Sequence, residues 1–173
     1  MLDQANTCVA AREETQGPYW FDVDSIRSDL REDRPGTPLL LAVRTHDMSA
    51  CANGSAPTAI PNIVVEIWHC DAGGAYSGFG SASQAGPGGG GPGGASGGGG
   101  SGETSDGSYS VGELEASPTD DGTYLCGAQV ADRNGVVQFT TIYPGWYRGR
   151  TVHIHLKLHV DRKTVLTNAA LLR

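Results

Sequence analysis

Hydrophobic and polar residues alternate along one stretch near the carboxyl end of this chain. Between Arg150 and His159 nearly every second residue is apolar. A period of two is typical of a β-strand that has one face against the core. His153 and His155 would then share the other face of the strand, about 7 Å apart. The residues expected to face the core are Val152, Ile154, Leu156, Leu158 and Val160.

Four further stretches have the composition of strands. They cover residues 39–46, 62–69, 122–131 and 135–142, and 163–166 is a candidate for one more. Asn134-Gly135 stands between the third and fourth stretch, which is a strong signal for a β-hairpin. Short strands separated by turns, with little helical periodicity, predict an all-β fold in the form of an antiparallel β-sandwich.

Two segments lack a strand pattern. Residues 1–37 are expected to be irregular, with a short helical turn at 24–31. From about residue 80 to residue 107 the composition falls to Gly, Ser, Pro and Ala, which predicts a flexible surface loop because ordering it costs too much entropy. The glycines lack the strand-to-helix context of a phosphate-binding loop. Length and composition together predict one domain over residues 1–173.

Charge and hydropathy restrict the classes of partner. Charged residues make up 18% of the 173 residues, and the formal net charge is -7. This balance argues against nucleic acid as a partner. The sequence contains no apolar stretch of the roughly 18 residues that would cross a membrane, so no membrane span is expected.

The chain has four cysteines, at positions 8, 51, 70 and 126, without a C-x-x-C pair that would indicate zinc. An even number in a glycine-rich chain favours two disulfides and an oxidising compartment. The sequence leaves the connectivity open, and four buried free thiols are the alternative. A secreted protein is therefore expected, and its signal peptide would have been removed before Met1.

Candidate metal ligands lie in the same carboxyl-terminal region. His153 and His155 can converge on one ion, and Tyr147 precedes them in the turn 143–147. Phenols beside imidazoles indicate a metal that prefers hard anionic oxygen as well as nitrogen. A histidine pair can also line the wet face of a strand, which is the role expected for His159 and Lys157.

Three segments resemble the intradiol ring-cleavage dioxygenases. They are residues 66–78 (EIWHCDAGGAYSG), 140–147 (TTIYPGWY) and 149–155 (GRTVHIH). The stretch ETQGPYW, residues 14–20, is similar to the acidic Glu-Gly-Pro-Tyr stretch that lies near the substrate pocket in that family. The spacing Tyr-x5-His-x-His, with an arginine three residues before the first histidine, is specific. The cysteine positions resemble the extracellular, actinobacterial-type branch.

The resemblance implies a mononuclear non-haem Fe(III) bound by Tyr76, Tyr147, His153 and His155. Fe(III) is a hard ion that suits oxygen donors. A bound cation also favours the phenolate over a phenol whose ordinary pKa is about 10. Two phenolates and one hydroxide would balance three positive charges, which makes the centre tolerable inside a low-dielectric protein.

The resemblance also implies an activity, the cleavage of a catechol-type ring by O2 to a cis,cis-muconate-type product. Tyr147 would leave the metal and accept a substrate proton, whereas Tyr76 would stay bound. Arg150 would stabilise negative charge on the ring during oxygen attack. The residues expected to line the pocket are Pro18, Tyr19, Trp146 and Ile142.

Two positions depart from the family pattern. Ala169 stands where the family usually has a glutamine that helps to hold the substrate. Cys126 stands where many relatives have arginine, so a contact is lost or a disulfide is gained. The ring substituent of the substrate is open, with Arg148 or Arg12 as candidate partners for a carboxylated ring. Oligomeric state is open as well.

Two other functions are weighed against the dioxygenase. A zinc hydrolase would use the two histidines and a carboxylate such as Asp71, but it leaves the tyrosines unexplained. A catalytically impaired relative, or a module that binds aromatic compounds or carbohydrate, would use exposed tryptophans as stacking platforms. The candidates are Trp20, Trp68 and Trp146, of which Trp68 is expected in the core. His46 and His69 are expected to be structural or surface residues.

Overall fold

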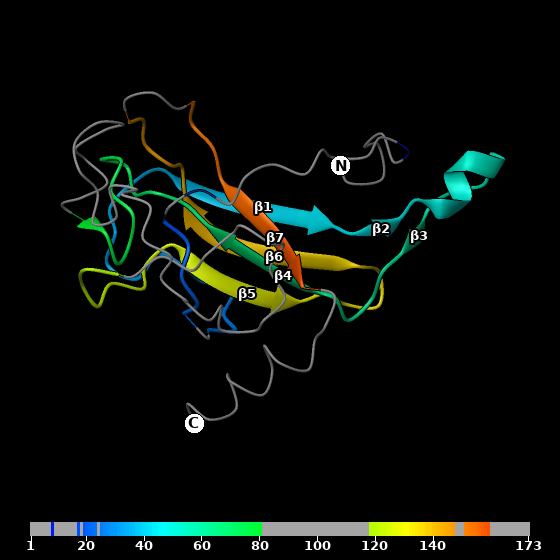
Figure 1. Cartoon of the computed structure of the whole chain (residues 1–173), viewed down its shortest axis with the longest axis horizontal. Helices are drawn as coiled ribbons and strands as arrows, with labels where there is room; N and C mark the ends of the chain where they lie inside the picture. The colour runs from blue at the N-terminus through cyan, green and yellow to red at the C-terminus, as the bar shows by residue number, and fades with distance from the viewer. Residues whose placement is uncertain are drawn as a thin grey trace, which may run out of the picture.

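The computed structural model describes residues 8, 17, 19–23, 25–80, 118–147 and 151–159. Strands β5, β4 and β7 form one antiparallel sheet in that order, β1 and β6 form a second antiparallel pair, and β2 and β3 form a two-residue ladder (Figure 1). The elements are β1 (Pro38–Arg44), β2 (His46–Asp47), the 3-10 helix η2 (Ser49–Asn53), β3 (Thr58–Ala59), β4 (Val64–Trp68), β5 (Cys126–Val130), β6 (Val136–Ile142) and β7 (His155–His159).

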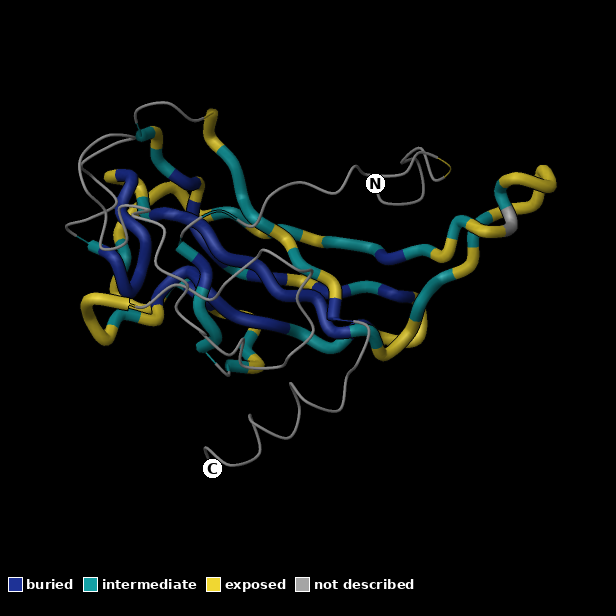
Figure 2. Tube along the Cα trace, in the orientation of Figure 1, coloured by how far each residue is buried: buried dark blue, intermediate teal, exposed yellow. Residues whose placement is uncertain are grey.

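A hydrophobic core fills the space between the two sheets. Strand β4 contributes Val65 and Ile67, and β6 contributes Val137 and Phe139; all four are buried in one cluster. Alternate residues of a strand point to the same face, so these positions face one another across the sandwich. Figure 2 shows that buried residues, in dark blue, follow the strands of the two sheets. The predicted all-β, antiparallel fold is confirmed.

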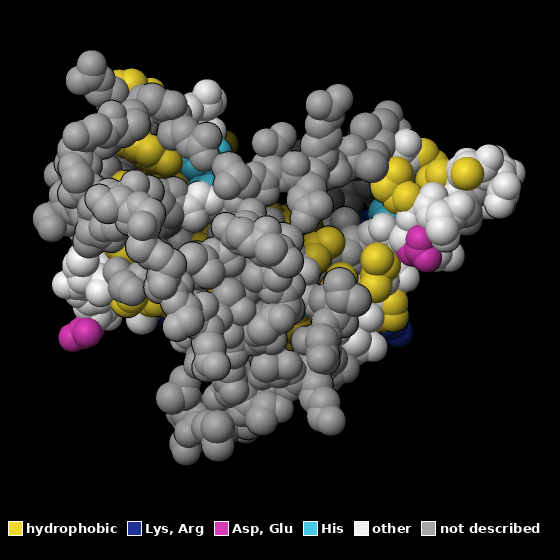
Figure 3. Space-filling view, in the orientation of Figure 1, with side chains coloured by type: hydrophobic (Ala, Val, Ile, Leu, Met, Phe, Trp, Pro, Cys, Tyr) yellow, Lys and Arg dark blue, Asp and Glu magenta, His cyan; other side chains and the backbone are white. Residues whose placement is uncertain are grey.

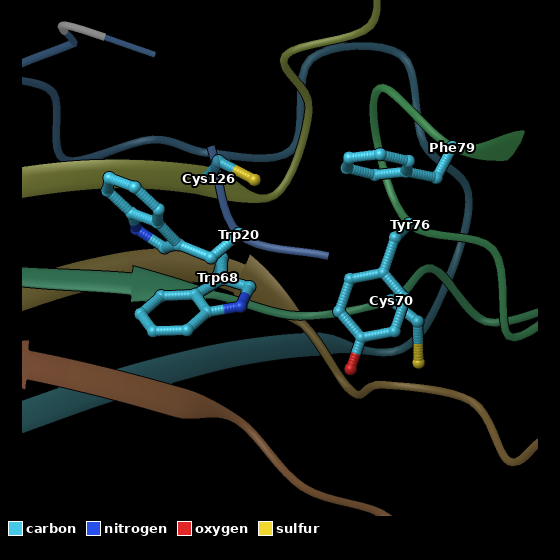
Figure 4. Packing of buried hydrophobic residues seen from close by; sticks show 6 residues of the cluster. All are labelled: Trp20, Trp68, Cys70, Tyr76, Phe79 and Cys126. Carbon is cyan, nitrogen blue, oxygen red and sulfur yellow. The ribbon is translucent and has the colours of Figure 1, made fainter. Parts of the chain in front are cut away.

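The other face of β4 is buried as well. Trp68 on this face packs edge-on against Trp20, with ring centroids 6.5 Å apart. Both belong to a second buried cluster with Cys70, Tyr76, Phe79 and Cys126 (Figure 4). The irregular amino-terminal segment therefore covers the outer face of the three-stranded sheet.

The predicted hairpin between residues 122–131 and 135–142 is wrong. The turn itself forms, because the Gly135 N–H donates to the Asp132 carbonyl at 2.9 Å. However, β5 pairs with β4 whereas β6 pairs with β1. The chain thus crosses from one sheet to the other at Asn134-Gly135, because a turn motif does not determine which strand the chain joins next.

The amino-terminal segment contains bridges where a helical turn was expected. Ile26 pairs with Ala128 and Asp29 pairs with Thr140, each as an isolated parallel bridge. Leu30 is fully buried in the core between the sheets. Residues 81–117, which include almost all of the glycine-rich stretch, and 163–166 lie outside the described residues. No helix in the described ranges is long and apolar enough to cross a membrane.

The two faces of β7 differ from expectation. Leu156 and Leu158 lie opposite Ile67 and Val65 of β4 and so point to the core side, but they are still 45% and 43% exposed. Strand β7 forms an edge of the described three-stranded sheet. At this edge the second sheet covers the side chains of β7 only in part. Val152, also expected in the core, is 48% exposed.

The expected wet face of β7 is largely buried. His159 is 5% exposed, and its Nε2 lies 2.8 Å from Glu66 Oε2. Lys157 is half-buried, with Nζ 4.5 Å from the ring centroid of Trp20. The prediction failed because the cover comes from residues distant in the sequence.

The cysteines form one disulfide, between Cys8 and Cys51, and Cys70 and Cys126 are free and buried. The expectation of two disulfides is therefore wrong, and so is the alternative of four free thiols. Cys126 Sγ lies 3.0 Å from Ser77 Oγ. Position 126 thus has a buried free thiol and no second disulfide.

Both free thiols are expected to be inert in the native protein. Burial raises the pKa of Cys70 to about 11 and that of Cys126 to about 12. Because the thiolate is the reactive form, a thiol reagent at pH 8 should detect no reactive thiol before denaturation and two per chain afterwards. No thiol after denaturation would contradict the pairing, since it would require two disulfides.

Candidate metal centre

A tight turn after β4 positions Tyr76. The Asp71 carboxylate accepts hydrogen bonds from the backbone N–H groups of Gly73 and Ala75 at 2.8 and 3.0 Å. Gly74 takes a φ of 88°, a left-handed conformation that glycine adopts without a steric penalty. The chain then enters the core at Tyr76, which is 1% exposed.

The loop after β6 packs directly on this turn. The Gly145 N–H donates to the Asp71 carbonyl at 2.8 Å. A Cβ at Gly145 would lie 2.6 Å from the carbonyl carbon of Ala72, closer than any real contact. Glycine at 145 therefore permits the backbone approach that brings Tyr147 next to the turn of Tyr76.

His155 is held by the adjacent strand. It pairs with Trp68 in the β4–β7 ladder, and the imidazole stacks on the indole with ring centroids 4.7 Å apart and an interplanar angle of 5°. Trp68 is itself buried. The packing of β4 thus fixes the plane of the His155 ring.

His153 precedes β7, and its tautomer follows from its contact with Thr151. The Nδ1 atom lies within hydrogen-bond distance of the Thr151 carbonyl oxygen. A carbonyl only accepts, so Nδ1 must carry the proton and Nε2 must present its lone pair. This is how proteins usually orient a histidine for a metal.

The four candidate ligands converge. Tyr76 Oη lies 3.1 Å from His153 Nε2, 3.3 Å from His155 Nε2 and 3.4 Å from Tyr147 Oη. His153 Nε2 lies 3.1 Å from His155 Nε2 and 3.4 Å from Tyr147 Oη. Side chains from three separate segments therefore meet at one point.

These separations suit a shared metal ion. Nitrogen and oxygen ligands at about 2.0–2.1 Å from a first-row metal, at roughly tetrahedral angles, lie about 3.3 Å from one another. His153 Nε2 and His155 Nε2 lie only 3.1 Å apart, so one cation could be bound by both nitrogens. The donor set of two phenols and two imidazoles fits a hard ion such as Fe(III).

The same geometry weakens the zinc alternative. Within the described ranges, no three His, Cys, Asp or Glu side chains are grouped to hold a metal ion. The carboxylate of Asp71 is engaged in its own turn, and its second oxygen lies 3.8 Å from Arg34. A metal ion at this cluster would therefore need the phenol oxygens as ligands.

Aromatic residues surround the cluster. Tyr19 stacks on Tyr76 with ring centroids 4.8 Å apart and an interplanar angle of 25°. Burial, and secondly the charge of Tyr147, raise the pKa of Tyr19. Trp146 is 67% exposed. Figure 3 shows histidine atoms at the described surface, next to hydrophobic side chains.

Several residues predicted to line the pocket or to stack on a ligand do not lie at the cluster or are not described. Ile142 is fully buried in a core cluster with Tyr124 and Leu125, where it serves packing. Trp20 and Trp68 are also buried, so the stacking-platform alternative retains only Trp146. The predictions for Pro18, Arg150, Arg148, Arg12 and Ala169 lie outside the described residues.

His69 is structural, as expected. Its Nδ1–H donates to the Cys70 carbonyl at 2.8 Å, and its Nε2 accepts from Thr141 Oγ1 at 2.7 Å. Burial lowers the pKa of His69, which favours the neutral ring that these two bonds require. Sequence reasoning missed the roles of Trp68 and Glu66; the charged Glu66 in an otherwise apolar strand was the available signal.

Solved structures of dioxygenases are similar to this chain. An intradiol ring-cleavage dioxygenase from Tetranychus urticae is 30% identical, with a TM-score of 0.65 over 91% of this chain. The match covers 62% of that enzyme, so this chain spans less than two thirds of its length.

Two more distant structures share the fold. Hydroxyquinol 1,2-dioxygenase from Pseudomonas putida DLL-E4 is 14% identical, with a TM-score of 0.56 over 92% of this chain and 48% of that enzyme. The dioxygenase domain of a dioxygenase–carbohydrate-binding protein fusion from Streptomyces sp. SirexAA-E is 23% identical, with a TM-score of 0.50 over 86% of this chain and 65% of that domain. No protein-family model and no curated protein match the chain.

Proposed function

Because the chain belongs to the intradiol ring-cleavage dioxygenases, we propose that it cleaves a catechol-type ring with O2. The product would be a cis,cis-muconate, which contains both oxygen atoms of O2. The observation that supports this proposal is the convergence of two phenol oxygens and two imidazole nitrogens within 3.1–3.4 Å. The metal would be a mononuclear Fe(III) held by Tyr76, Tyr147, His153 and His155.

When bound, ferric iron supplies Lewis acidity and a template for a chelating catechol. The protein supplies ligand orientation. Thr151 holds His153 in the tautomer with a free Nε2 lone pair, and Trp68 holds the ring plane of His155. Both histidines are thus oriented before the metal arrives, which reduces the cost of ordering them.

The two tyrosines differ in burial, which supports different roles for them. Tyr76 is 1% exposed and is packed under the ring of Tyr19. Tyr147 is only half-buried and lies in the loop after β6. We therefore assign to Tyr147 Oη the acceptance of a proton from a catechol hydroxyl, which requires a side chain that can move, and to Tyr76 the fixed position.

Three further residues have roles in the proposed reaction. Tyr19 and Trp146 would contact the substrate ring, and Arg150 would stabilise negative charge during oxygen attack. A panel of substituted catechols, assayed by oxygen consumption and product mass, would identify which catechol derivative is the substrate.

The proposed location is outside the cell. The Cys8–Cys51 disulfide favours an oxidising compartment, as in a secreted protein.

Colour tests the proposal directly. A phenolate bound to Fe(III) gives a visible charge-transfer band, so the purified protein should be red-brown with about one iron per chain. Tyr147→Phe should weaken and shift this band because one of two phenolates is lost. Tyr143→Phe is the matched control, since Tyr143 lies in the same loop and is 56% exposed. Colourless protein with stoichiometric zinc would contradict the proposal.

A further inference from the structure

The buried carboxylate of Glu66 connects three segments that are distant in the sequence, close to the four candidate metal ligands. Glu66, in the middle of β4, is 5% exposed. Its Oε1 accepts from Trp20 Nε1–H at 3.1 Å, and its Oε2 lies 2.8 Å from His159 Nε2. These partners are 46 and 93 residues away in the sequence. Because an unpaired buried charge is costly, both contacts are needed to retain the carboxylate here.

The groups around Glu66 oppose one another electrostatically. Burial raises the pKa of Glu66, whereas hydrogen bonding and charge from His159 lower it; Asp22 raises it further and Trp20 lowers it. The ammonium of Lys157 lies over the ring of Trp20. The indole of Trp20 is thus held at two points, by its N–H and by its face.

Both partners of Glu66 are connected to proposed metal ligands. Tyr19 is the neighbour of Trp20 in the sequence and stacks on Tyr76. His159 lies on the same face of β7 as His155, four residues along the strand. Glu66 therefore links the segment of Tyr19, which covers Tyr76, to strand β7, which contains His155.

We propose that Glu66 is a positioning residue for the substrate pocket: it clamps Trp20, and with it the Tyr19 wall, against the strand of His155. This inference rests on the proposed function, because it takes the substrate to be a catechol whose ring contacts Tyr19. The clamp acts on substrate binding, because neither Glu66 nor Trp20 touches the reacting atoms.

Trp20→Phe removes the indole N–H and keeps an aromatic ring in the core. KM for catechol is expected to rise about five- to tenfold, with kcat within about twofold. This is the effect expected when the loss of one hydrogen bond to a charged group weakens substrate binding. Glu66→Gln should shift KM in the same direction by less, because the amide oxygen still accepts but lacks the charge. The effects of the two changes on KM should be less than additive in the double variant, since both weaken the Trp20–Glu66 hydrogen bond.

A spectroscopic measurement tests the clamp without turnover. The chain has three tryptophans, so 15N-labelled protein loaded with diamagnetic Ga(III) in place of paramagnetic Fe(III) should give three indole N–H signals. The Trp20 signal should move in Glu66→Gln, while that of the exposed Trp146 should stay in place.

Thr45→Val is the matched control. Thr45 is 5% exposed, and its hydroxyl oxygen lies 3.1 Å from the carbonyl oxygens of Ile60 and Gly135. It stands between β1 and β2, and this end of β1 lies away from the start of β7 (Figure 1). The variant should lower thermal stability without a change in KM. An active, coloured enzyme whose KM is unchanged by Trp20→Phe overturns the clamp alone. Protein without iron or turnover overturns the proposed function, and the indole signals then still report whether Glu66 binds Trp20.

Discussion

Replacing His155 by alanine is expected to abolish iron binding and, with it, all oxygen uptake with catechol. The change removes one of the two proposed nitrogen donors, whose Nε2 lies 3.1 Å from His153 Nε2 and 3.3 Å from Tyr76 Oη. It also leaves the indole of Trp68 without its stacked partner. Since loss of an outer-sphere partner alone typically weakens metal binding about 10- to 100-fold, loss of a ligand should reduce affinity by at least about 100-fold.

Metal analysis, the visible spectrum and an oxygen electrode measure this effect together. His46→Ala is the control, because His46 is half-buried in β2, away from the cluster. The control should keep its iron, colour and turnover. A His155→Ala protein that retains stoichiometric iron and an unshifted band would mean that His155 is not a ligand.

Strand positions could be predicted from the sequence because their signal is local. The apolar composition of residues 39–46 and 135–142 predicted strands, and β1 and β6 formed there with burial that changes between neighbouring residues. The pairing partners were not predictable, because pairing depends on contacts distant in the sequence. The Asn134-Gly135 turn is therefore correct as a turn but wrong as a hairpin.

The candidate site was predicted on different grounds. His153, His155 and the nearby Tyr147 indicated a metal from the chemistry of their side chains, whereas Tyr76 was predicted only from the resemblance to the intradiol dioxygenases. The burial of Glu66 and His159 could not be deduced in this way. Neither residue indicates its partner, and the contact joins positions 93 residues apart. A charge within an apolar strand predicts that some partner exists, but not which one.

A second large effect is expected at Gly145, which touches neither metal nor substrate. In Gly145→Ala, the new Cβ would lie 2.6 Å from the Ala72 carbonyl carbon and 2.7 Å from the Asp71 carbonyl oxygen. These are backbone atoms held by the hydrogen-bonded turn, so the loop must move instead. A shift of about 1 Å in a catalytic group can reduce the rate about 100-fold, and Tyr147 is two residues away. We expect a loss of turnover of that order.

The visible band separates displacement of Tyr147 from general unfolding. If the loop moves while the sandwich stays folded, Gly145→Ala should keep its β-sheet circular dichroism and lose phenolate absorption to a similar degree as Tyr147→Phe. Gly80→Ala is the matched control, because its Cβ would meet Asp120 at an ordinary 3.6 Å. Wild-type turnover and colour in Gly145→Ala would show that the turn yields to the loop, and that the close packing of these two backbones does not position Tyr147.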